Sequence, residues 1–373
     1  MSELDPVTVE QAHRFPCDNC GSDLRFQPGT DMLVCDHCGH EEAISGSPWT
    51  RAGAAQEIDF QKGLRASLAD EEMEETRVLS CRNCGATVEF DPAVHAAECP
   101  FCATPVVTDT GANRHIKPKA LLPFHLAEDQ ARKAMTDWLG SLWFAPNGLQ
   151  DYARKGRKMS GVYMPYWTFD ADTKSRYKGE RGTEYHETKT VTRNGKKQQV
   201  RVTKVRWRSA SGRVGRFFDD VLVAASAALP DRFRPALGRW DLAELEPYQP
   251  VYLAGFRAEA YTVDLEAGFD EARALMDRVI LRDVKMDIGG DRQRVHRIDT
   301  DVSDVTFKHI LLPVWIAAYR YRGKAYRFCV NGRTGAVSGE RPWSAWKIAI
   351  ALIIALILAA GIGYAVALNQ GQI

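Results

Sequence analysis

Four Cys-x-x-Cys pairs near the start of the chain constrain its fold more than any other feature. Eight of the nine cysteines fall into these pairs, and the pattern C-x2-C-x14-C-x2-C occurs twice, 64 residues apart. The repeat extends beyond the thiols, because CDNCGSDLRFQP matches CRNCGATVEFDP. Two such pairs, joined by a short hairpin, can point four thiolates at one place in a tetrahedral shell. The expected metal ligands are Cys17, Cys20, Cys35 and Cys38 in one shell and Cys81, Cys84, Cys99 and Cys102 in the other.

Four thiolates leave no open coordination position, so the shells predict two structural Zn²⁺ ions rather than catalytic ones. A module of this size has little core of its own, and metal binding supplies its folding free energy. Iron is chemically compatible with the same ligands. Disulfides would need an oxidising compartment, and Met1–His13 lacks the charged start and apolar run of a signal peptide. The ninth cysteine, Cys329, lies in an apolar strand pattern and is expected in the core.

The C-terminal end carries a long apolar run. Ile348–Leu368 contains no charged residue, and as a helix it spans about 31 Å, close to the hydrocarbon thickness of a bilayer. The sequence therefore predicts a single-pass membrane helix over 346–368, with 369–373 as a short translocated tail. The N-terminus and body are then expected in the cytoplasm, at the inner membrane. The residues that flank the run are of the interfacial kind, namely Arg341, Trp343, Trp346 and Lys347.

Small residues recur every four positions along this predicted membrane helix. Such a stripe lets a second helix approach closely, so we expect self-association or pairing with another span. Alanine is common in membrane spans, so a stripe without a partner remains the alternative. The contact residues expected on this stripe are Ala355, Ala359 and Gly363.

The charge of the chain is divided between its two ends. Residues 1–111 hold 7 Lys/Arg and 20 Asp/Glu, a net of −13, whereas the rest of the chain has a net of +14. Two zinc–thiolate shells make the N-terminal part more negative still. Nucleic acid requires the opposite sign, so the cysteine modules are interpreted as an acidic head that contacts protein.

The body predicts a mixed α+β fold. Strands are expected at Leu121–Phe124, Gly161–Asp172, 310–320 and 325–330, helices at Ala127–Leu142 and Phe269–Asp287, and a two-residue hairpin turn at Asn194-Gly195. MPYW at 164–167 resembles LPVW at 312–315, and each follows a helix pattern, so a duplicated helix-plus-sheet unit is expected. The domains expected along the chain are a tail (1–14), zinc ribbon 1 (15–44), an acidic linker (45–77), zinc ribbon 2 (78–110), the body (112–342) and the membrane helix.

One stretch of the body is strongly basic. Lys174–Arg216 contains 14 Lys/Arg and only 3 Asp/Glu. Four interpretations remain open: a solvated hairpin face, an anionic lipid surface, an acidic protein such as the chain's own head, and nucleic acid, which the charge of the head makes the least favoured. The candidate contact residues are Lys189, Arg193, Lys196, Lys197, Arg201, Lys204, Arg206 and Arg208.

Catalytic motifs do not occur in the sequence. There is no G-x-x-x-x-G-K-[ST], H-E-x-x-H or G-x-S-x-G pattern. We therefore expect no catalytic residues and a protein that is not an enzyme.

The tandem cysteine modules, GVYMPYWTFDADTKSRYKGERG, LLPVWIAAYRYRGKAYRFCVNGRTGAVSGERPWS and the terminal apolar run together resemble bacterial TFIIB-type zinc-ribbon membrane proteins. Members of that family often carry the label primosomal protein N′ (replication factor Y) or superfamily II helicase. This chain lacks the phosphate-binding motif of a helicase. The resemblance therefore implies the domain plan and the eight zinc ligands, and no reaction.

These observations predict a tail-anchored, non-catalytic membrane scaffold whose acidic zinc-ribbon head recruits a protein partner. The alternative hypothesis is a membrane-tethered nucleic-acid-binding protein accessory to replication. A homo-oligomer is compatible with both hypotheses.

Overall fold

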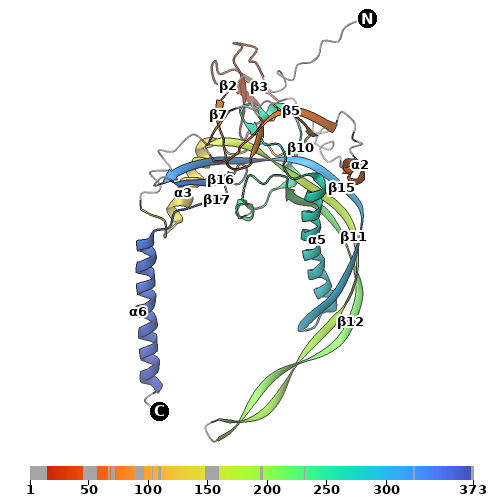
Figure 1. The fold of residues 1–373 in the computed structure, drawn as a ribbon, viewed down its shortest axis with the longest axis vertical. Helices are drawn as coiled ribbons and strands as arrows, with labels where there is room; N and C mark the ends of the chain where they lie inside the picture. Colours follow the sequence, from red (N-terminus) through yellow and green to blue (C-terminus); the bar gives the residue numbers. More distant parts are fainter. Residues whose placement is uncertain are drawn as a thin grey trace.

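The computed structural model describes residues 15–44, 57–65, 68, 72–89, 96–102, 104–107, 111–147, 159–193, 196–230, 232–321 and 324–370. Figure 1 shows small cysteine-bearing sheets at one end of a mixed helix-and-sheet body. A long, curved β-structure and helix α6 (Ala345–Gln370) extend from the opposite side of the body. The expected α+β class is confirmed.

One nine-stranded sheet organises the body. Its main path runs β12 (Lys196–Ala224), β11 (Ser160–Arg193), β15 (Arg292–Tyr321), β10 (Ala120–Leu121) and β13 (Glu246–Pro247). Four further strands pair with this path, namely β4 (Ile58–Asp59), β14 (Arg257–Ala258), β16 (Lys324–Asn331) and β17 (Val337–Gly339). Short 3-10 helices lie between β12 and β14: η3 (Pro235–Leu237), η4 (Leu242–Glu244) and η5 (Pro250–Leu253).

The two faces of this sheet bury different cores. Helices α3 (Glu128–Ser141) and α5 (Leu265–Ile288) contribute to cores that contain Tyr163 and Trp167 of β11. The neighbouring residues Val162 and Met164 belong to a third core, which includes the buried side chains of the second cysteine module. This alternation is the two-residue period expected of a strand that is buried on both faces.

The body contains the same order of elements twice, as the MPYW and LPVW segments suggest. Strand, helix, long strand and partner strand follow one another as β10-α3-β11-β12 and again as β14-α5-β15-β16. The long strands pair antiparallel with Met164 opposite Leu312. β10 runs parallel to β15 with Ala120 opposite Ile310, and β14 runs parallel to β11 with Arg257 opposite Val162. The two arrangements are therefore related by a pseudo-two-fold axis near the Met164–Leu312 pair.

A long arm, here called the leg, extends from this sheet and comprises residues 171–218 of β11 and β12 and 292–303 of β15. The register shifts on both sides of β11 next to Asp170. Asp220 and Asp304 have φ of 50° and 52°, on the two strands that flank this point. Paired β-bulges of this kind bend and twist a sheet, and the leg curves away from the body (Figure 1). At about 3.3 Å per residue, the 34 residues of the curved strand β11 have a length along the chain of about 110 Å.

The cysteine modules are small sheets of short strands. The first contains β1 (Leu24–Gln27), β2 (Met32–Cys35) and β3 (Glu41–Ala43). The second contains β5 (Met73–Ser80), β6 (Thr87–Glu89) and β9 (Gly111–Ile116), with β7 (Ala96–Glu98) and β8 (Pro105–Val107) as a separate pair. The second sheet thus extends beyond the expected limits of 78–110.

Several sequence predictions differ from the structure in detail. The expected acidic linker, 45–77, includes β4 and the short helix α2 (Phe60–Leu64), and Phe60 packs against Phe169 and Phe269. Of the expected strand 121–124, only Leu121 is in a strand, because Pro123 has no N–H for a ladder. Asn194-Gly195 lies outside the described residues, but Arg193 pairs with Lys196, as a two-residue hairpin requires.

Candidate metal centres and membrane-facing elements

Each cysteine module brings four sulfur atoms to one place. The Sγ atoms of Cys17 and Cys38 are 3.6 Å apart, and those of Cys20 and Cys35 are 3.5 Å apart. In the second module, both the Cys81–Cys102 and the Cys84–Cys99 separations are 3.6 Å. A tetrahedral shell with Zn–S bonds of about 2.3 Å has S···S edges of about 3.8 Å. A disulfide is much shorter, at about 2.05 Å. The eight expected ligands therefore form two four-cysteine groups with the size of a metal shell.

Glycine fixes the turns that carry the thiols. Gly21, Gly39 and Gly85 each follow the second cysteine of a pair, and their φ values lie between 72° and 75°. The N–H of Gly21 donates to the carbonyl of Cys17 at 2.8 Å, which closes the turn, and Gly85 does the same to Cys81. A side chain at these positions would be strained, because L-residues rarely adopt positive φ.

The environments of the thiols differ within a shell. Burial raises the pKa of Cys17 to about 11, whereas the backbone N–H of His40 lowers the pKa of Cys38 to about 6. Four thiolates at this separation repel one another, so a cation is needed to hold all four in the charged form. Soft thiolates suit Zn²⁺, and the donor set fits that ion.

Both modules attach to one segment of the body. The N–H of Phe26, on β1, donates to the carbonyl of Ala254 at 3.0 Å, and the Phe26 ring contacts Tyr252. On the second module, the carbonyl of Thr87 accepts from the N–H of Ala260 at 3.0 Å. Residues 252–260 therefore hold the two four-cysteine groups against the same end of the sheet.

The predicted basic contact residues all lie on the hairpin of β11 and β12. The structure describes the side chains of Lys189, Arg201 and Arg208 as exposed. Lys204 forms an ion pair with Glu187, and the Arg206 guanidinium lies 5.3 Å from the centre of the Tyr185 ring. The side chains of Arg193, Lys196 and Lys197 lie outside the described part. Figure 1 shows this hairpin on the side of the body away from the cysteine modules, so the acidic head and the basic stretch are not in contact here.

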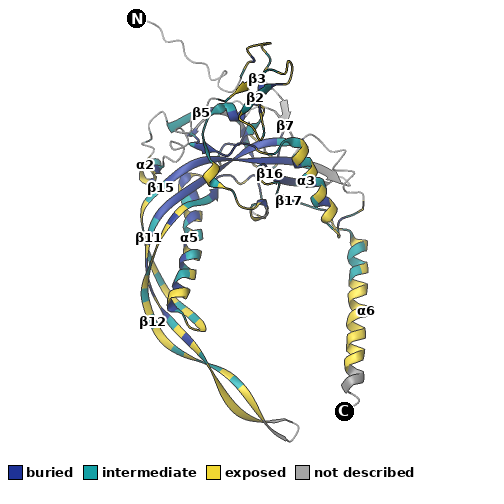
Figure 2. Cartoon of the chain, turned by 180° about the vertical axis from the view of Figure 1, so that it is seen from behind, coloured by how far each residue is buried: buried dark blue, intermediate teal, exposed yellow. Residues whose placement is uncertain are grey.

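Helix α6 is the one candidate membrane span among the described residues. Its apolar window has a mean hydropathy of 2.6 and none of it is buried, and every residue from 352 to 366 is exposed (Figure 2). Its first turn is tied to the loop after α3: the Lys347 ammonium donates to the carbonyls of Trp143 and Ala145 at 3.0 and 2.9 Å. The expected stripe residues Ala355, Ala359 and Gly363 lie along this exposed helix.

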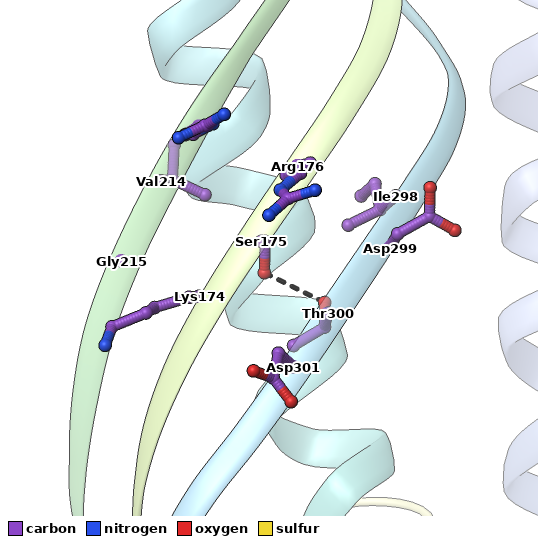
Figure 3. Close-up of a pocket in the computed structure, with 10 residues that line it drawn as sticks. Lys174, Ser175, Arg176, Val214, Gly215, Ile298, Asp299, Thr300 and Asp301 are labelled. Atoms are coloured by element: carbon purple, nitrogen blue, oxygen red, sulfur yellow. Dashed lines mark hydrogen bonds between the residues drawn. The ribbon is translucent and has the colours of Figure 1, made fainter.

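The leg carries an open depression of about 760 Å³ (Figure 3). In the strand pairing, Arg176 of β11 lies opposite Asp299 of β15 and Lys174 lies opposite Asp301, but the Lys174 side chain points away from Asp301 toward β12 (Figure 3). The Ser175 hydroxyl is 2.8 Å from the Thr300 hydroxyl, a partner that cannot act as a general base. Neither histidine nor cysteine occurs among the lining residues, and this surface builds no nucleophile–base pair.

A buried charged group at the top of the leg was not predicted from the sequence. The Lys308 ammonium, on β15, lies 2.8 Å from an Asp220 carboxylate oxygen and 3.3 Å from one of Glu57. Burial, together with a hydrogen bond shared with Glu57, raises the pKa of Asp170 to about 7. Glu57 precedes β4, so this group ties the segment between the two metal modules to the bend of the sheet. The group joins residues 251 positions apart, and no local pattern marks it.

Comparison with known proteins gives one relative without an assigned role. The chain is 26% identical over 338 residues to the uncharacterized protein YdjG of Bacillus subtilis (strain 168), which corresponds to 90% of this chain and 92% of that protein. No family model and no solved structure matches the chain. The likeness runs along nearly the whole of both chains, so it includes most of the body.

Proposed function

We propose that this protein is a non-catalytic membrane scaffold: α6 anchors it in a membrane, and two structural zinc ribbons present an acidic surface to a protein partner. One observation carries the proposal. The cysteine modules and α6 extend from opposite sides of the body (Figure 1). A chain anchored by α6 therefore holds the modules away from the membrane surface, where a partner can reach them.

The surface of the first module supports a protein partner rather than nucleic acid. Asp18, Glu41 and Glu42 are exposed there, and each zinc ion with four thiolates adds two further negative charges. Phosphates would be repelled, whereas a basic protein surface would be attracted. The closed shells have no position for a substrate, which supports a structural role for the metal. Zinc is the metal we propose, and iron is the alternative that elemental analysis decides.

The orientation of α6 relative to the body must be able to change at the N-terminal end of the helix. The leg and α6 extend on the same side of the body (Figure 2), yet the leg exposes charged side chains such as Lys174, Arg176 and Lys178. Each such residue at the centre of a bilayer costs about 2.5–3.5 kcal/mol or more. The leg therefore stays outside the hydrocarbon, and α6 turns relative to the body when it enters the membrane. The single-pass inner-membrane topology, with the body in the cytoplasm, is part of this proposal.

Affinity purification of the full chain from its native membranes, followed by quantitative mass spectrometry, tests the adaptor role. The test variant is Asp18→Asn/Glu41→Gln/Glu42→Gln, which changes the head and leaves every cysteine in place. The control is Glu266→Gln/Asp270→Asn/Asp277→Asn, which removes three exposed acids from α5. A partner that the head variant loses and the control keeps supports the proposal. Nucleic acid or replication proteins that persist after nuclease and salt washes would instead favour the membrane-tethered nucleic-acid-binding alternative.

A further inference from the structure

The strand register shows that the two faces of the leg differ in charge. One face packs against α5: the Tyr177 hydroxyl donates to Asp287 at 2.5 Å, and the Arg216 guanidinium pairs with Asp283 at 2.6 Å. We call this the α5 face and its opposite the outer face. Because side chains alternate along a strand, the odd-numbered residues of β11 from 173 to 191 and their β12 partners belong to the α5 face.

Beyond the end of α5 at Ile288, this face is uncovered and basic. Arg181 pairs with Arg208, Thr183 with Arg206 and Tyr185 with Lys204, and Lys189 lies further out. Among the described β11 and β12 side chains of this face, Glu187 is the one acidic residue, and it pairs with Lys204; Asp291, just before β15, accepts a hydrogen bond from the N–H of Glu184. We call this surface the basic face, and it comprises Arg181, Lys189, Lys204, Arg206 and Arg208.

The outer face at the same level is balanced by ion pairs. Arg292 pairs with Glu184 at 2.6 Å and Arg294 with Glu180 at 3.5 Å. The Arg294 guanidinium also lies 3.9 Å from the centre of the Trp207 ring. Most of the excess positive charge in this part of the chain therefore lies on one face, although Arg201, which pairs with Thr188, lies on the other.

We propose that the basic face lies on the anionic lipid headgroups of the membrane that α6 enters. This inference rests on the proposed function, because it uses α6 as a membrane anchor. Lys204, Arg206 and Arg208 form a row with a spacing of about 7 Å along β12, which matches a flat field of headgroups rather than one pocket for an ion. Val191 and Val200, 45% and 43% exposed, lie on the same face and suit the apolar edge of the headgroup layer.

The position of the basic face in the fold agrees with a contact to lipid headgroups. α5 lies on the side of the leg that is turned toward α6 (Figure 1), and the basic face continues the surface on which α5 packs. The outer part of the leg, which carries this face, extends on the same side of the body as α6 (Figure 2), so it can meet the membrane that α6 enters while the cysteine modules stay on the opposite side. The outer face, with its paired charges, then faces water. Single-stranded nucleic acid would need a series of aromatic stacking platforms, whereas Tyr185 is the one aromatic residue among the described side chains that lie beside the basic face on the same side of the hairpin.

Site-specific photocrosslinking of the full chain in lipid nanodiscs tests the proposal. Val191→p-benzoyl-phenylalanine places the probe on the basic face, and Thr190→p-benzoyl-phenylalanine places it on the outer face one residue away. In nanodiscs with about 30% phosphatidylglycerol, we expect lipid adducts from position 191 to exceed those from position 190 by about five-fold or more. Pure phosphatidylcholine, or salt of about 0.5 M, should remove most of this difference.

Two matched triple variants show whether the charges are the cause. Lys204→Gln/Arg206→Gln/Arg208→Gln neutralises the row on the basic face and should lower the adduct yield from position 191 about five-fold. Lys174→Gln/Arg176→Gln/Lys178→Gln removes the same charge, with the same spacing, from the outer face and should leave the yield unchanged.

Three outcomes would overturn the inference. These are equal adducts from the two probe positions, a yield that does not depend on anionic lipid, and loss of the lipid adducts when a single-stranded oligonucleotide of equal total charge is added. Alkaline extraction of native membranes that contain the chain distinguishes a wrong lipid contact from a wrong membrane anchor. If the chain stays in the membrane after extraction but the lipid adducts are absent, α6 is still a membrane anchor, and only the proposed contact between the basic face and lipid is wrong.

Discussion

Trp167 and Trp315 form matching hydrogen bonds at two ends of one sheet. The indole N–H of Trp167 donates to the carbonyl of Val263 at 3.0 Å, just before α5, and that of Trp315 donates to the carbonyl of Leu126 at 2.9 Å, just before α3. Each long strand therefore holds the start of the helix that belongs to the other repeat. The two repeats are interlocked, and neither can keep its core without its neighbour.

Replacing either tryptophan by phenylalanine should destabilise the body to a similar extent. Trp167→Phe and Trp315→Phe each keep an aromatic ring but leave a carbonyl without its indole donor, which costs about 1–3 kcal/mol. The free energy of unfolding, measured by urea denaturation in mild detergent, checks this prediction. Trp143→Phe is the control, because Trp143 is 76% exposed and its loss should change the free energy by less than about 0.5 kcal/mol. Strongly unequal losses would contradict the interlocked arrangement.

Removal of one thiol should remove one metal ion. Elemental analysis of the purified chain should find about two zinc ions per chain, as its two four-cysteine groups imply. Cys20→Ser should retain about one ion, because the second shell does not use Cys20. Cys329→Ser should retain both, since Cys329 is buried in the sheet, where its thiol contacts the carbonyl of Ser338. If iron is found in place of zinc, the four-cysteine metal shells are confirmed and the proposed identity of the metal is wrong.

The local patterns of the sequence predict part of this fold well. The spacing of the cysteines gives both four-cysteine groups, and the uncharged run gives α6, because each depends on residues close together in the chain. The Asn194-Gly195 signal also gives the correct strand pairing. Counting outward from the turn then pairs Tyr185 with Lys204, so the basic face could have been found in the sequence by following alternate residues.

The rest depends on contacts between distant segments. β11 extends to 34 residues, far past its apolar part, because β12 and β15 pair with it on both sides. The bend above the leg needs bulges at Asp220 and Asp304 on different strands. The sequence around each residue does not predict its bulge. The short pairing of β4 with β15 similarly unites the expected linker with the body, where Ile58 lies opposite Phe307.

The buried charged group predicts a dependence of stability on pH. The pKa of Asp170 rises from 3.8 in the unfolded chain to about 7, so the folded state holds this proton more tightly. The free energy of unfolding should therefore fall as the pH rises from about 4 to about 7. Asp170→Asn removes the titration and keeps an oxygen for the Asp220 N–H, so the fall between pH 5 and pH 8 should become smaller. Urea midpoints at the two pH values measure this.

The neighbouring Asp219, which is exposed, supplies the control for that experiment. Asp219→Asn removes a carboxylate at the same bend without touching the buried group, and the fall between pH 5 and pH 8 should remain as in the unchanged chain. Equal falls in the unchanged chain and in Asp170→Asn would show that the proton at Asp170 does not contribute to folding.

The stripe on α6 predicts association of the chain through its anchor. Gly363 has no neighbouring atom within 4 Å of an added Cβ, so Gly363→Leu fits this chain without strain and can only obstruct a second helix. Because close approach of small residues stabilises membrane helix pairs, this change should reduce association by about 1 kcal/mol or more. A membrane reporter assay or energy transfer between labelled chains in lipid measures the dimer. Ile362→Leu, one residue away, keeps a large side chain and should leave association unchanged. If Gly363→Leu associates as strongly as the unchanged chain, the stripe is not a contact surface.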